Sequence, residues 1–266
     1  EMCIRDSNLA DKLALERGRS DILIANNVLA HVPNIRDFVE SIYKLLSNNG
    51  VAIIEFPYAK NLVDANQFDT IYHEHYSYFT LSAINKILTE NRLLIFNVKK
   101  IATHGGSLRL YLVKDNNHSR GISNNVHKIL LEEKTLGVDS IKYFRDMQNF
   151  AFRIKIDFLQ FLIDAKNNNK KVIAYGAAAK GNTLLNYCGI KSDLIEFVID
   201  KSPFKSGKLM PGSHIPIKTE DEIIKFQPDF IVILPWNLLD EITRQLNYTQ
   251  KWNCKFVTAI PSLTIL

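Results

Sequence analysis

The chain has 266 residues, of which 46% are hydrophobic and 23% charged, a composition typical of a folded globular protein and not of a disordered one. Its formal net charge is +5, but the basic residues are scattered among acidic ones, which argues against a nucleic-acid-binding protein. Apolar runs are strand-sized, well short of the ~18 residues of a membrane span. The length predicts two compact units.

The cysteines and the first residues of the chain indicate in which cellular compartment the protein is expected. Cys3, Cys188 and Cys254 are far apart and lack C-x-x-C spacing, so they predict neither a disulfide framework nor a zinc site. A reducing cytoplasm is the expected location. The opening stretch EMCIRDS, residues 1–7, has no export character and does not match the pattern that follows. We therefore expect residues 1–7 to be extraneous to the domain.

Strands and helices alternate from residue 21 to residue 115. Phe38, Ile42 and Leu45 share one helical face, and Thr80 precedes a second helical pattern as an N-cap. The expected elements are strands 21–28 and 51–56, helices 34–47 and 81–91, and a closing pair of strands over 93–101 and 106–114. This order predicts a mostly parallel sheet with an antiparallel edge.

The rest of the chain divides into a helical segment and a second α/β unit. Residues 116–170 contain no strand pattern, and 138–169 predict one long connecting helix. From residue 171 on, strands and helices alternate again, which predicts a small doubly wound sheet. Its expected strands are 172–175, 197–200, 230–235 and 256–260, and its expected helices are 179–188, 219–226 and 237–246.

The stretch GAAAKGNT, residues 176–183, joins the first strand of the second unit to its helix. It differs from a phosphate-binding G-x-x-x-x-G-K-[ST] loop because Lys180 precedes Gly181 and Asn182 stands in the lysine position. It also lacks the central glycine of G-x-G-x-x-G. A weaker anion site at the helix start, to which Lys180 adds charge, and tight packing without a ligand both fit. Asp200 fits a ribose ligand or a turn cap equally well.

The stretch IYHEHYSYF, residues 71–79, concentrates proton-handling side chains. His73 and His75 are expected on one side of an extended segment, where they would bind a metal with Glu55 or His104, run acid/base chemistry, or line a structural loop. Because no H-x-x-x-H or cysteine pattern supports it, no metal is predicted. In THGGSLR, residues 103–109, Arg109 is either a surface charge or a phosphate ligand.

Four separated stretches resemble the sugar C-methyltransferases. They are DILIANNVLAHVPNIRDFV, IIEFPY with NQFDTIYHEHYSYFTL, THGGSLRLYL, and AYGAAAKGNTLLNYCGI with VIDKSPFKSGKLMPGSHIPI. Members of that family use S-adenosylmethionine to methylate a ring carbon of nucleotide-linked keto-deoxysugars. The resemblance implies the second half of a class I methyltransferase Rossmann-like sheet in 1–115, a helical connector in 116–170 and a C-terminal α/β domain in 171–266.

The family also has a zinc-binding N-terminal domain and a cofactor-gripping glycine loop, neither of which occurs in this sequence. We therefore expect an N-terminally truncated chain with little or no activity, and zinc only in the missing N-terminal part.

The resemblance also implies roles for single residues. His75 would be the catalytic base, with Glu74 and Tyr72 orienting the sugar or polarising its keto oxygen, and His73 would serve packing. The cofactor side would be lined by Asn26, Asn27 and His31. The expected contacts to the nucleotide-diphosphate sugar are His104, Arg109, Gly176, Lys180, Asn182 and Lys201.

Two other functions fit the residues in part. An NAD-dependent nucleotide-sugar dehydrogenase or epimerase also uses α/β units, but it requires a glycine fingerprint that neither unit contains. The other is a non-enzymatic sugar-nucleotide-binding module. The sequence leaves open the sugar, the methylated carbon and the oligomeric state, and it predicts neither a nucleic-acid nor a membrane partner.

Overall fold

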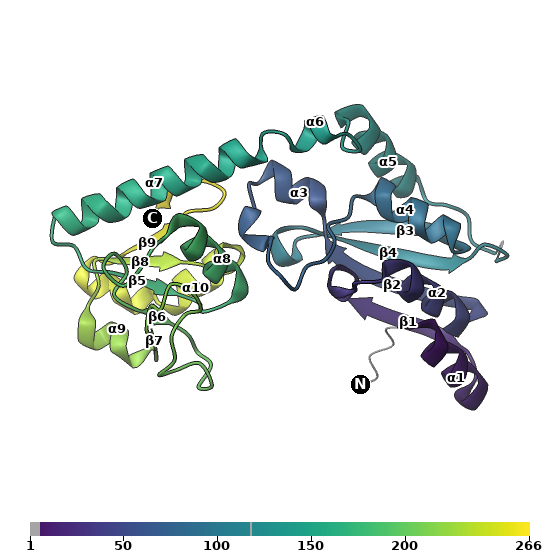
Figure 1. Ribbon diagram of the computed structural model, residues 1–266, viewed down its shortest axis with the longest axis horizontal. Helices are drawn as coiled ribbons and strands as arrows, with labels where there is room; N and C mark the ends of the chain where they lie inside the picture. Colours follow the sequence, from purple (N-terminus) through teal and green to yellow (C-terminus); the bar gives the residue numbers. More distant parts are fainter. Residues whose placement is uncertain (1–5, 118) are drawn as a thin grey trace. The chain divides into compact units, whose positions relative to one another are not determined.

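The computed structural model describes residues 6–117 and 119–266 (Figure 1). Contacts divide the chain into two compact units, the first formed by residues up to 63 with 73–145, the second by 64–72 with 146–266. The division at 145 falls inside the segment predicted as a connector. Residues 1–5 of the stretch predicted to be extraneous, Cys3 included, lie outside the described residues. Asp6 belongs to the fold, since its carboxylate caps α1 (Ser7–Arg17) by accepting from the amide of Leu9 at 2.7 Å.

The first unit is built on a four-stranded sheet in the order β1-β2-β4-β3. Its two parallel strands pair directly, and the antiparallel hairpin lies on the far side of the second one. The antiparallel edge is present as predicted, but the prediction of a mostly parallel sheet is wrong, because the β1–β2 pairing is parallel while the β2–β4 and β3–β4 pairings are antiparallel. The strands are β1 (Ser20–Asn26), β2 (Leu46–Pro57), β3 (Leu93–Ile101) and β4 (Ser107–Lys114).

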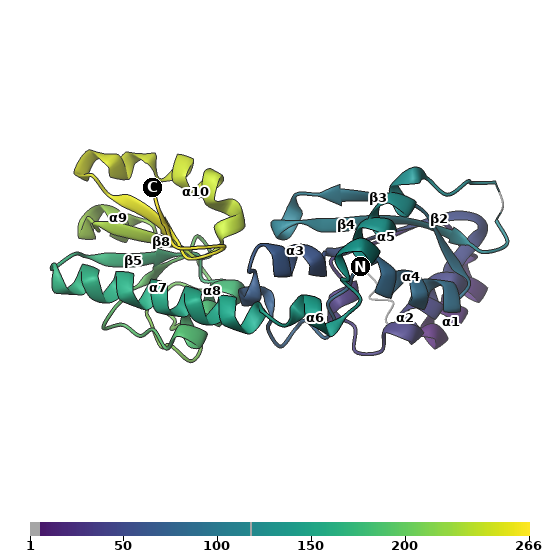
Figure 2. The same cartoon turned by 90° about the horizontal axis from the view of Figure 1, so that it is seen from above.

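Helices cover one face of this sheet, as the view in Figure 2 shows. Phe38, Ile42 and Leu45, predicted to share a helical face, are all buried. Besides α1, the helices of this unit are α2 (Ile35–Leu45), α3 (Ala59–Asp64), α4 (Leu81–Glu90), α5 (Asn124–Leu136) and α6 (Ile141–Phe144). Two 3-10 turns, η1 (Leu29–His31) and η3 (Thr103–Gly105), follow β1 and β3.

The start of α4 is fixed twice. Thr80 caps it as predicted, its hydroxyl accepting from the amide of Ala83 at 3.1 Å. The carboxylate of Glu133 on α5, only 1% exposed, accepts from the amides of Leu81 at 2.6 Å and Ser82 at 2.7 Å and from the hydroxyl of Tyr58 at 2.7 Å. Glu133 therefore joins α5 to α4 and to the segment after β2, so this part of the predicted connector belongs to the first unit.

The prediction of one continuous helix over 138–169 is wrong. The short helix α6 ends at Phe144, and α7 (Met147–Asn167) begins after Arg145 and Asp146. Both segments have apolar residues at helical spacing, and that spacing does not reveal a two-residue interruption. Among the described residues, no helix is long and apolar enough to cross a membrane.

The second unit contains a six-stranded sheet in the order β10-β9-β8-β5-β6-β7, in which only β10 is antiparallel. The four predicted strands are present, and two further strands of two residues each were missed because they are too short to show a pattern. The strands are β5 (Val172–Tyr175), β6 (Val198–Ile199), β7 (Ile217–Lys218), β8 (Phe230–Ile233), β9 (Lys255–Thr258) and β10 (Thr264–Ile265).

Helices pack on both faces of this sheet. One layer holds α7 and α8 (Ala179–Cys188), and the other holds α9 (Asp221–Phe226) and α10 (Leu239–Gln245). From β5 the chain runs outward through β6 and β7, then returns to the other side of β5 as β8. The strand order thus reverses between β5 and β8, the place where doubly wound sheets bind ligands beyond the carboxyl ends of their strands.

Glu133→Ala is expected to lower the stability of the first unit by about 2–4 kcal/mol, because it leaves two helix amides and a buried hydroxyl without an acceptor. The measurement is the urea midpoint of the unfolding transition followed by circular dichroism. Glu132→Ala, at the neighbouring half-buried position, serves as the control and should shift the midpoint much less. Equal shifts for the two variants would contradict the capping role of Glu133.

Candidate functional site

Polar side chains meet at the carboxyl end of β1. Asn27 has a left-handed backbone with φ 54°, and its amide donates to the carbonyl of Glu55 at 2.8 Å. Its side-chain nitrogen donates to Nε2 of His104, 3.2 Å away, and His104 is also left-handed with φ 55°. Oδ1 of Asn27 is buried and accepts no hydrogen bond from the described residues. Because buried acceptors are almost always bonded, this oxygen fits a donor group of a bound cofactor.

Glu55 lies at the centre of this arrangement and is 3% exposed. Its carboxylate accepts from the hydroxyl of Thr103 at 3.0 Å and from Nε and Nη2 of Arg109 at 3.0 and 2.8 Å. The hydrogen bond to Glu55 raises the pKa of Arg109. The carboxylate that the sequence offered as a metal ligand is thus held by an arginine. No group of three potential metal ligands occurs among the residues that the structure describes.

The histidine loop lies against η1. The amide of Tyr76 donates to the carbonyl of Ala30 at 2.8 Å, which places the ring of His75 4.8 Å from that of His31, edge to face. The ring of Tyr78 also packs edge to face against the ring of His75, with 5.9 Å between the ring centroids. His75 is half-buried, so its ring is supported by aromatic neighbours but not enclosed by hydrocarbon.

The prediction that His73 and His75 lie on one side of an extended segment is wrong, because His73 and Glu74 form an exposed turn. Tyr72 clusters with the second unit. Of the residues predicted for catalysis and the cofactor, the structure brings His75 against His31, and it pairs Asn27 with His104, a predicted substrate contact, while Asn26 lies exposed at the end of β1. Their assigned roles stay predictions.

In the second unit the reversal of strand order is lined by residues that sequence reasoning largely missed. Lys180 lies 4.4 Å above the ring of Trp236, and its Nζ donates to Oδ1 of Asn237 at 3.0 Å. The indole nitrogen of Trp236 donates to Oδ2 of Asp69 at 2.8 Å. Burial lowers the pKa of Lys180. Only Lys180 carried a sequence signal, because Asp69 and Trp236 are 167 residues apart.

Asp69 is fully buried, and its second oxygen has no hydrogen-bond donor within the described part of the chain. Burial raises the pKa of Asp69 to about 6, against the lowering effect of the hydrogen bond from Trp236. A carboxyl group of this kind changes its charge close to neutral pH, unlike an exposed aspartate.

The glycine loop after β5 packs tightly. A Cβ on Gly176, which has φ +97°, would lie 2.4 Å from Pro235, and one on Gly181 would lie 2.8 Å from Leu234. Asp200 accepts from the amide of Ala177 at 2.8 Å, and it bonds Lys205 at 3.1 Å. Asp200 therefore holds the loop, which favours the turn-capping interpretation over the ribose ligand.

The start of α8 has the free backbone amides that an anion site at a helix N-terminus requires. Ala178 caps this helix without a side-chain hydrogen bond, so the first amides of α8 are available to an anion. Asn182 lies in the first turn, half-buried, and its Oδ1 accepts from Asn186 at 3.3 Å. Lys201 is exposed in the loop after β6.

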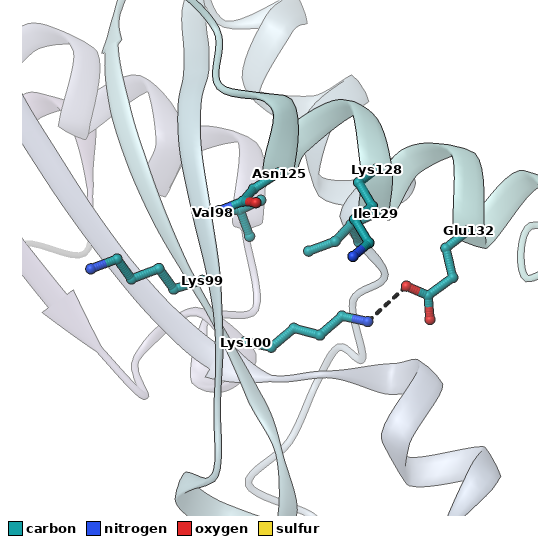
Figure 3. A pocket seen from close by; sticks show the side chains of 7 residues that line it. All are labelled: Val98, Lys99, Lys100, Asn125, Lys128, Ile129 and Glu132. Atoms are coloured by element: carbon teal, nitrogen blue, oxygen red, sulfur yellow. Dashed lines mark hydrogen bonds and ion pairs between the residues drawn. The ribbon is translucent and has the colours of Figure 1, made fainter.

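The first unit also has a groove of about 330 Å³ between β3 and α5, apart from all the residues predicted for function. Figure 3 shows Lys100 reaching across it to Glu132, with an Nζ–Oε2 distance of 2.7 Å. Lys60 approaches the same carboxylate at 3.4 Å, and the hydrogen bond from Lys100 lowers the pKa of Glu132. The acidic side chain of the groove is thus paired on both sides, and the groove carries a structural ion-pair network.

Comparisons with known proteins identify the family of the chain. The model of the C-methyltransferase C-terminal domain family matches residues 102–261, more than half of the chain, and a methyltransferase domain model matches residues 4–93. C-methyltransferase NovU of Streptomyces niveus is 28% identical over 260 residues, which cover 98% of this chain and 62% of NovU. The chain thus spans less than two thirds of the length of this relative.

Among solved structures, magnesium protoporphyrin IX methyltransferase of Synechocystis PCC 6803 with bound SAH is 22% identical and has a TM-score of 0.30, covering 38% of this chain and 48% of its own. The M1.HpyAVI–SAM complex is 15% identical with a TM-score of 0.27, covering 42% and 53%. At these TM-scores neither structure bears on the site.

The buried Asp69 predicts a pH dependence of stability in the second unit. Its pKa is raised from 3.8 to about 6, so the folded state binds the proton more tightly than the unfolded state. The stabilisation from this group is full below the unfolded pKa and is lost as the pH rises through about 6. The free energy of unfolding that this group contributes at low pH, and that is lost at high pH, is about 3 kcal/mol. Asp69→Asn should remove this loss, measured as the urea midpoint between about pH 4 and pH 7.

The fluorescence of Trp236, isolated by Trp252→Phe in all samples, reports the unfolding of the second unit. Asp193→Asn, at an exposed position, is the control and should leave the pH dependence as in the parent. If Asp69→Asn keeps the parent's slope, the titrating group is not Asp69.

The Glu55–Arg109 pair predicts an asymmetry between its two partners. Arg109→Ala leaves a buried carboxylate without its cation, whereas Glu55→Gln leaves an arginine whose side chain is 37% exposed and can be hydrated. The midpoint temperature of thermal unfolding should therefore fall further for Arg109→Ala than for Glu55→Gln. Lys225→Ala, which breaks an exposed pair with Asp221, is the control and should shift least. The opposite ranking would show that Glu55 does not depend on Arg109.

Proposed function

Because the chain belongs to the C-methyltransferase family, we propose that the protein transfers a methyl group from S-adenosylmethionine to a ring carbon of a nucleotide-linked keto-deoxysugar. The observation that supports this most is the placement of His75, half-buried against His31 beside the carboxyl end of β1. In open α/β sheets this edge is where ligands bind. The relative NovU is named a C-methyltransferase, and it extends beyond the length that this chain spans.

The proposed reaction needs a carbon nucleophile. A ring nitrogen of His75 removes the proton from the sugar carbon next to the ketone, and the electron pair of that C–H bond forms an enolate. S-adenosylmethionine, when bound, supplies an electrophilic methyl group on a sulfonium. The enolate carbon takes this methyl group, the carbon–sulfur bond breaks, and its electrons stay on sulfur. The proton remains on His75 until it passes to solvent.

Other side chains would orient the reactants. We assign Glu74 and Tyr72 to orienting the sugar or polarising its keto oxygen, by their places just before His75 in the sequence. The cofactor would lie against Asn26, Asn27 and His31, where the unbonded Oδ1 of Asn27 suits a hydroxyl or amine donor. Alignment of the reactants lowers the activation free energy by up to about 7–11 kcal/mol where the geometry is ideal.

We further assign the nucleotide diphosphate to the reversal of strand order between β5 and β8 in the second unit. In the first unit, His104 and Arg109 stay predicted substrate contacts. The first amides of α8 and Lys180 supply the positive potential that a diphosphate needs, and Asn182 and Lys201 flank this end of the sheet. Gly176 lets the loop pack against Pro235, which a side chain would approach to 2.4 Å, and we assign this loop to the substrate. A thymidine diphosphate should therefore bind the second unit in the absence of cofactor.

His75→Ala is expected to abolish methyl transfer, a loss of about 10²- to 10⁴-fold if only base catalysis is removed. The assay uses the complete gene product with a panel of thymidine-diphosphate keto-deoxysugars and measures the released S-adenosylhomocysteine. Calorimetry should show unchanged S-adenosylmethionine affinity. The ketone-adjacent hydrogen should exchange with deuterated solvent in the parent without cofactor and not in the variant.

His73→Ala is the matched control, because the neighbouring exposed imidazole should leave the rate within about a fewfold of the parent. Full activity in His75→Ala would refute the assignment of the base. Calorimetry with each ligand separately also distinguishes the alternatives: binding of NAD would favour a dehydrogenase or epimerase, and binding of the sugar nucleotide by a protein that does not bind S-adenosylmethionine at all would favour a binding module.

A further inference from the structure

The helix α7 has two apolar sides. One packs into the core of the second unit through Ala151, Ile154, Phe158, Leu162 and Ala165. On another side, Phe152, Ile156 and Ile163 are 55%, 50% and 44% exposed, with the half-buried Leu159 between them. A helix that only covers a sheet needs one apolar stripe, and the opposite side is normally polar. The three exposed side chains together with the half-buried Leu159, which also packs against the core, are called the α7 stripe below.

The spacing of the α7 stripe is that of a helix–helix seam. Steps of four, three and four residues follow the alternation of d and a positions in a heptad, with Phe152 and Leu159 at d and Ile156 and Ile163 at a. At 3.6 residues per turn these four side chains lie within about 60° of each other around the helix axis. Single exposed apolar residues are ordinary, but a continuous apolar row indicates a docking surface.

Charges beside the α7 stripe favour a copy of the same helix as the partner. Arg153 and Asp164 lie on the same flank, near opposite ends of the stripe, and neither forms an ion pair within the described part of the chain. In an antiparallel pair related by a two-fold axis, Arg153 of each helix faces Asp164 of the other. A parallel pair would place Arg153 beside Gln148 and Lys155 instead. The charges are therefore self-complementary in one orientation.

We propose that a second copy of this chain packs antiparallel on the α7 stripe and forms a homodimer. Phe152 of one copy then contacts Ile163 of the other, Ile156 contacts Leu159, and the two Arg153–Asp164 pairs close one flank. The two-fold symmetry makes the interface self-complementary, as in most homodimers. A seam of four side chains per copy is small beside the roughly 1,600 Å² of a standard interface, so the dimer dissociates on dilution.

Sedimentation velocity over a series of concentrations of the full chain tests the dimer. The parent should change reversibly from monomer to dimer, and Ile156→Lys should raise the dissociation constant at least about tenfold. Ile224→Lys is the matched control, since Ile224 on α9 is also 56% exposed but lies off the stripe. A parent that stays monomeric, or equal effects of the two variants, would overturn the proposal. A stripe covered by another segment of a longer gene product would also give a monomer.

The orientation has its own test. Arg153→Asp should weaken the dimer and the double variant with Asp164→Arg should restore it, which a misfolded variant would not do. Phe152→Cys and Ile163→Cys chains, mixed under oxidising conditions, should form the mixed disulfide in preference to either homodisulfide. Preferred homodisulfides would overturn the antiparallel arrangement. The parent's cysteines within the described residues, Cys188 and Cys254, are buried and do not compete.

Discussion

The geometry of the first unit depends on one buried carboxylate. Glu55 holds the end of β1 through its backbone carbonyl and the turn η3 through its side chain, while Arg109 on the neighbouring strand supplies the compensating charge. A carboxylate taken out of water is costly unless a cation and further donors surround it, and here three donors do. The bonds that compensate for desolvation of Glu55 also fix the positions of β1, β2, β4 and η3 relative to one another. Asn27 and His104, the two left-handed residues at this edge, are held by that relation.

Much of this fold was readable from the sequence because its signals are local. The apolar face of Phe38, Ile42 and Leu45, the cap at Thr80 and the strands of both sheets depend on neighbours a few residues apart, and the structure places them as predicted. Strands β7 and β10 were missed since two residues show no alternation. The break between α6 and α7 was missed since apolar spacing continues on both sides of it.

The polar contacts were harder to predict because they join distant positions. The sequence near Asp69 does not indicate that Trp236 is its hydrogen-bond partner. Likewise, the sequence near Glu133 does not indicate that its carboxylate caps the start of α4. Motif matching pointed to His75 and Lys180 but considered Glu55 only as an alternative metal ligand, because residue type alone does not distinguish a ligand carboxylate from one bound by arginine. That distinction requires the register of β2 and β4, which pairs Glu55 with Arg109.

The two units solve the problem of a buried carboxylate differently, and the difference has a consequence for function. Glu55 has a cation within 3 Å, whereas the side-chain donor to Asp69 is the indole N–H of Trp236, and Lys180 lies 4.4 Å above the ring of that tryptophan. When Asp69 loses its proton, the new charge must be balanced by Lys180 and by the Trp236 hydrogen bond. The negative charge of an ionised Asp69 attracts Lys180 and opposes the binding of a phosphate at the start of α8. In the proposed enzyme, anion affinity at the second sheet would therefore be greatest when Asp69 is neutral, on the acidic side of about pH 6, and would decline as this aspartate ionises.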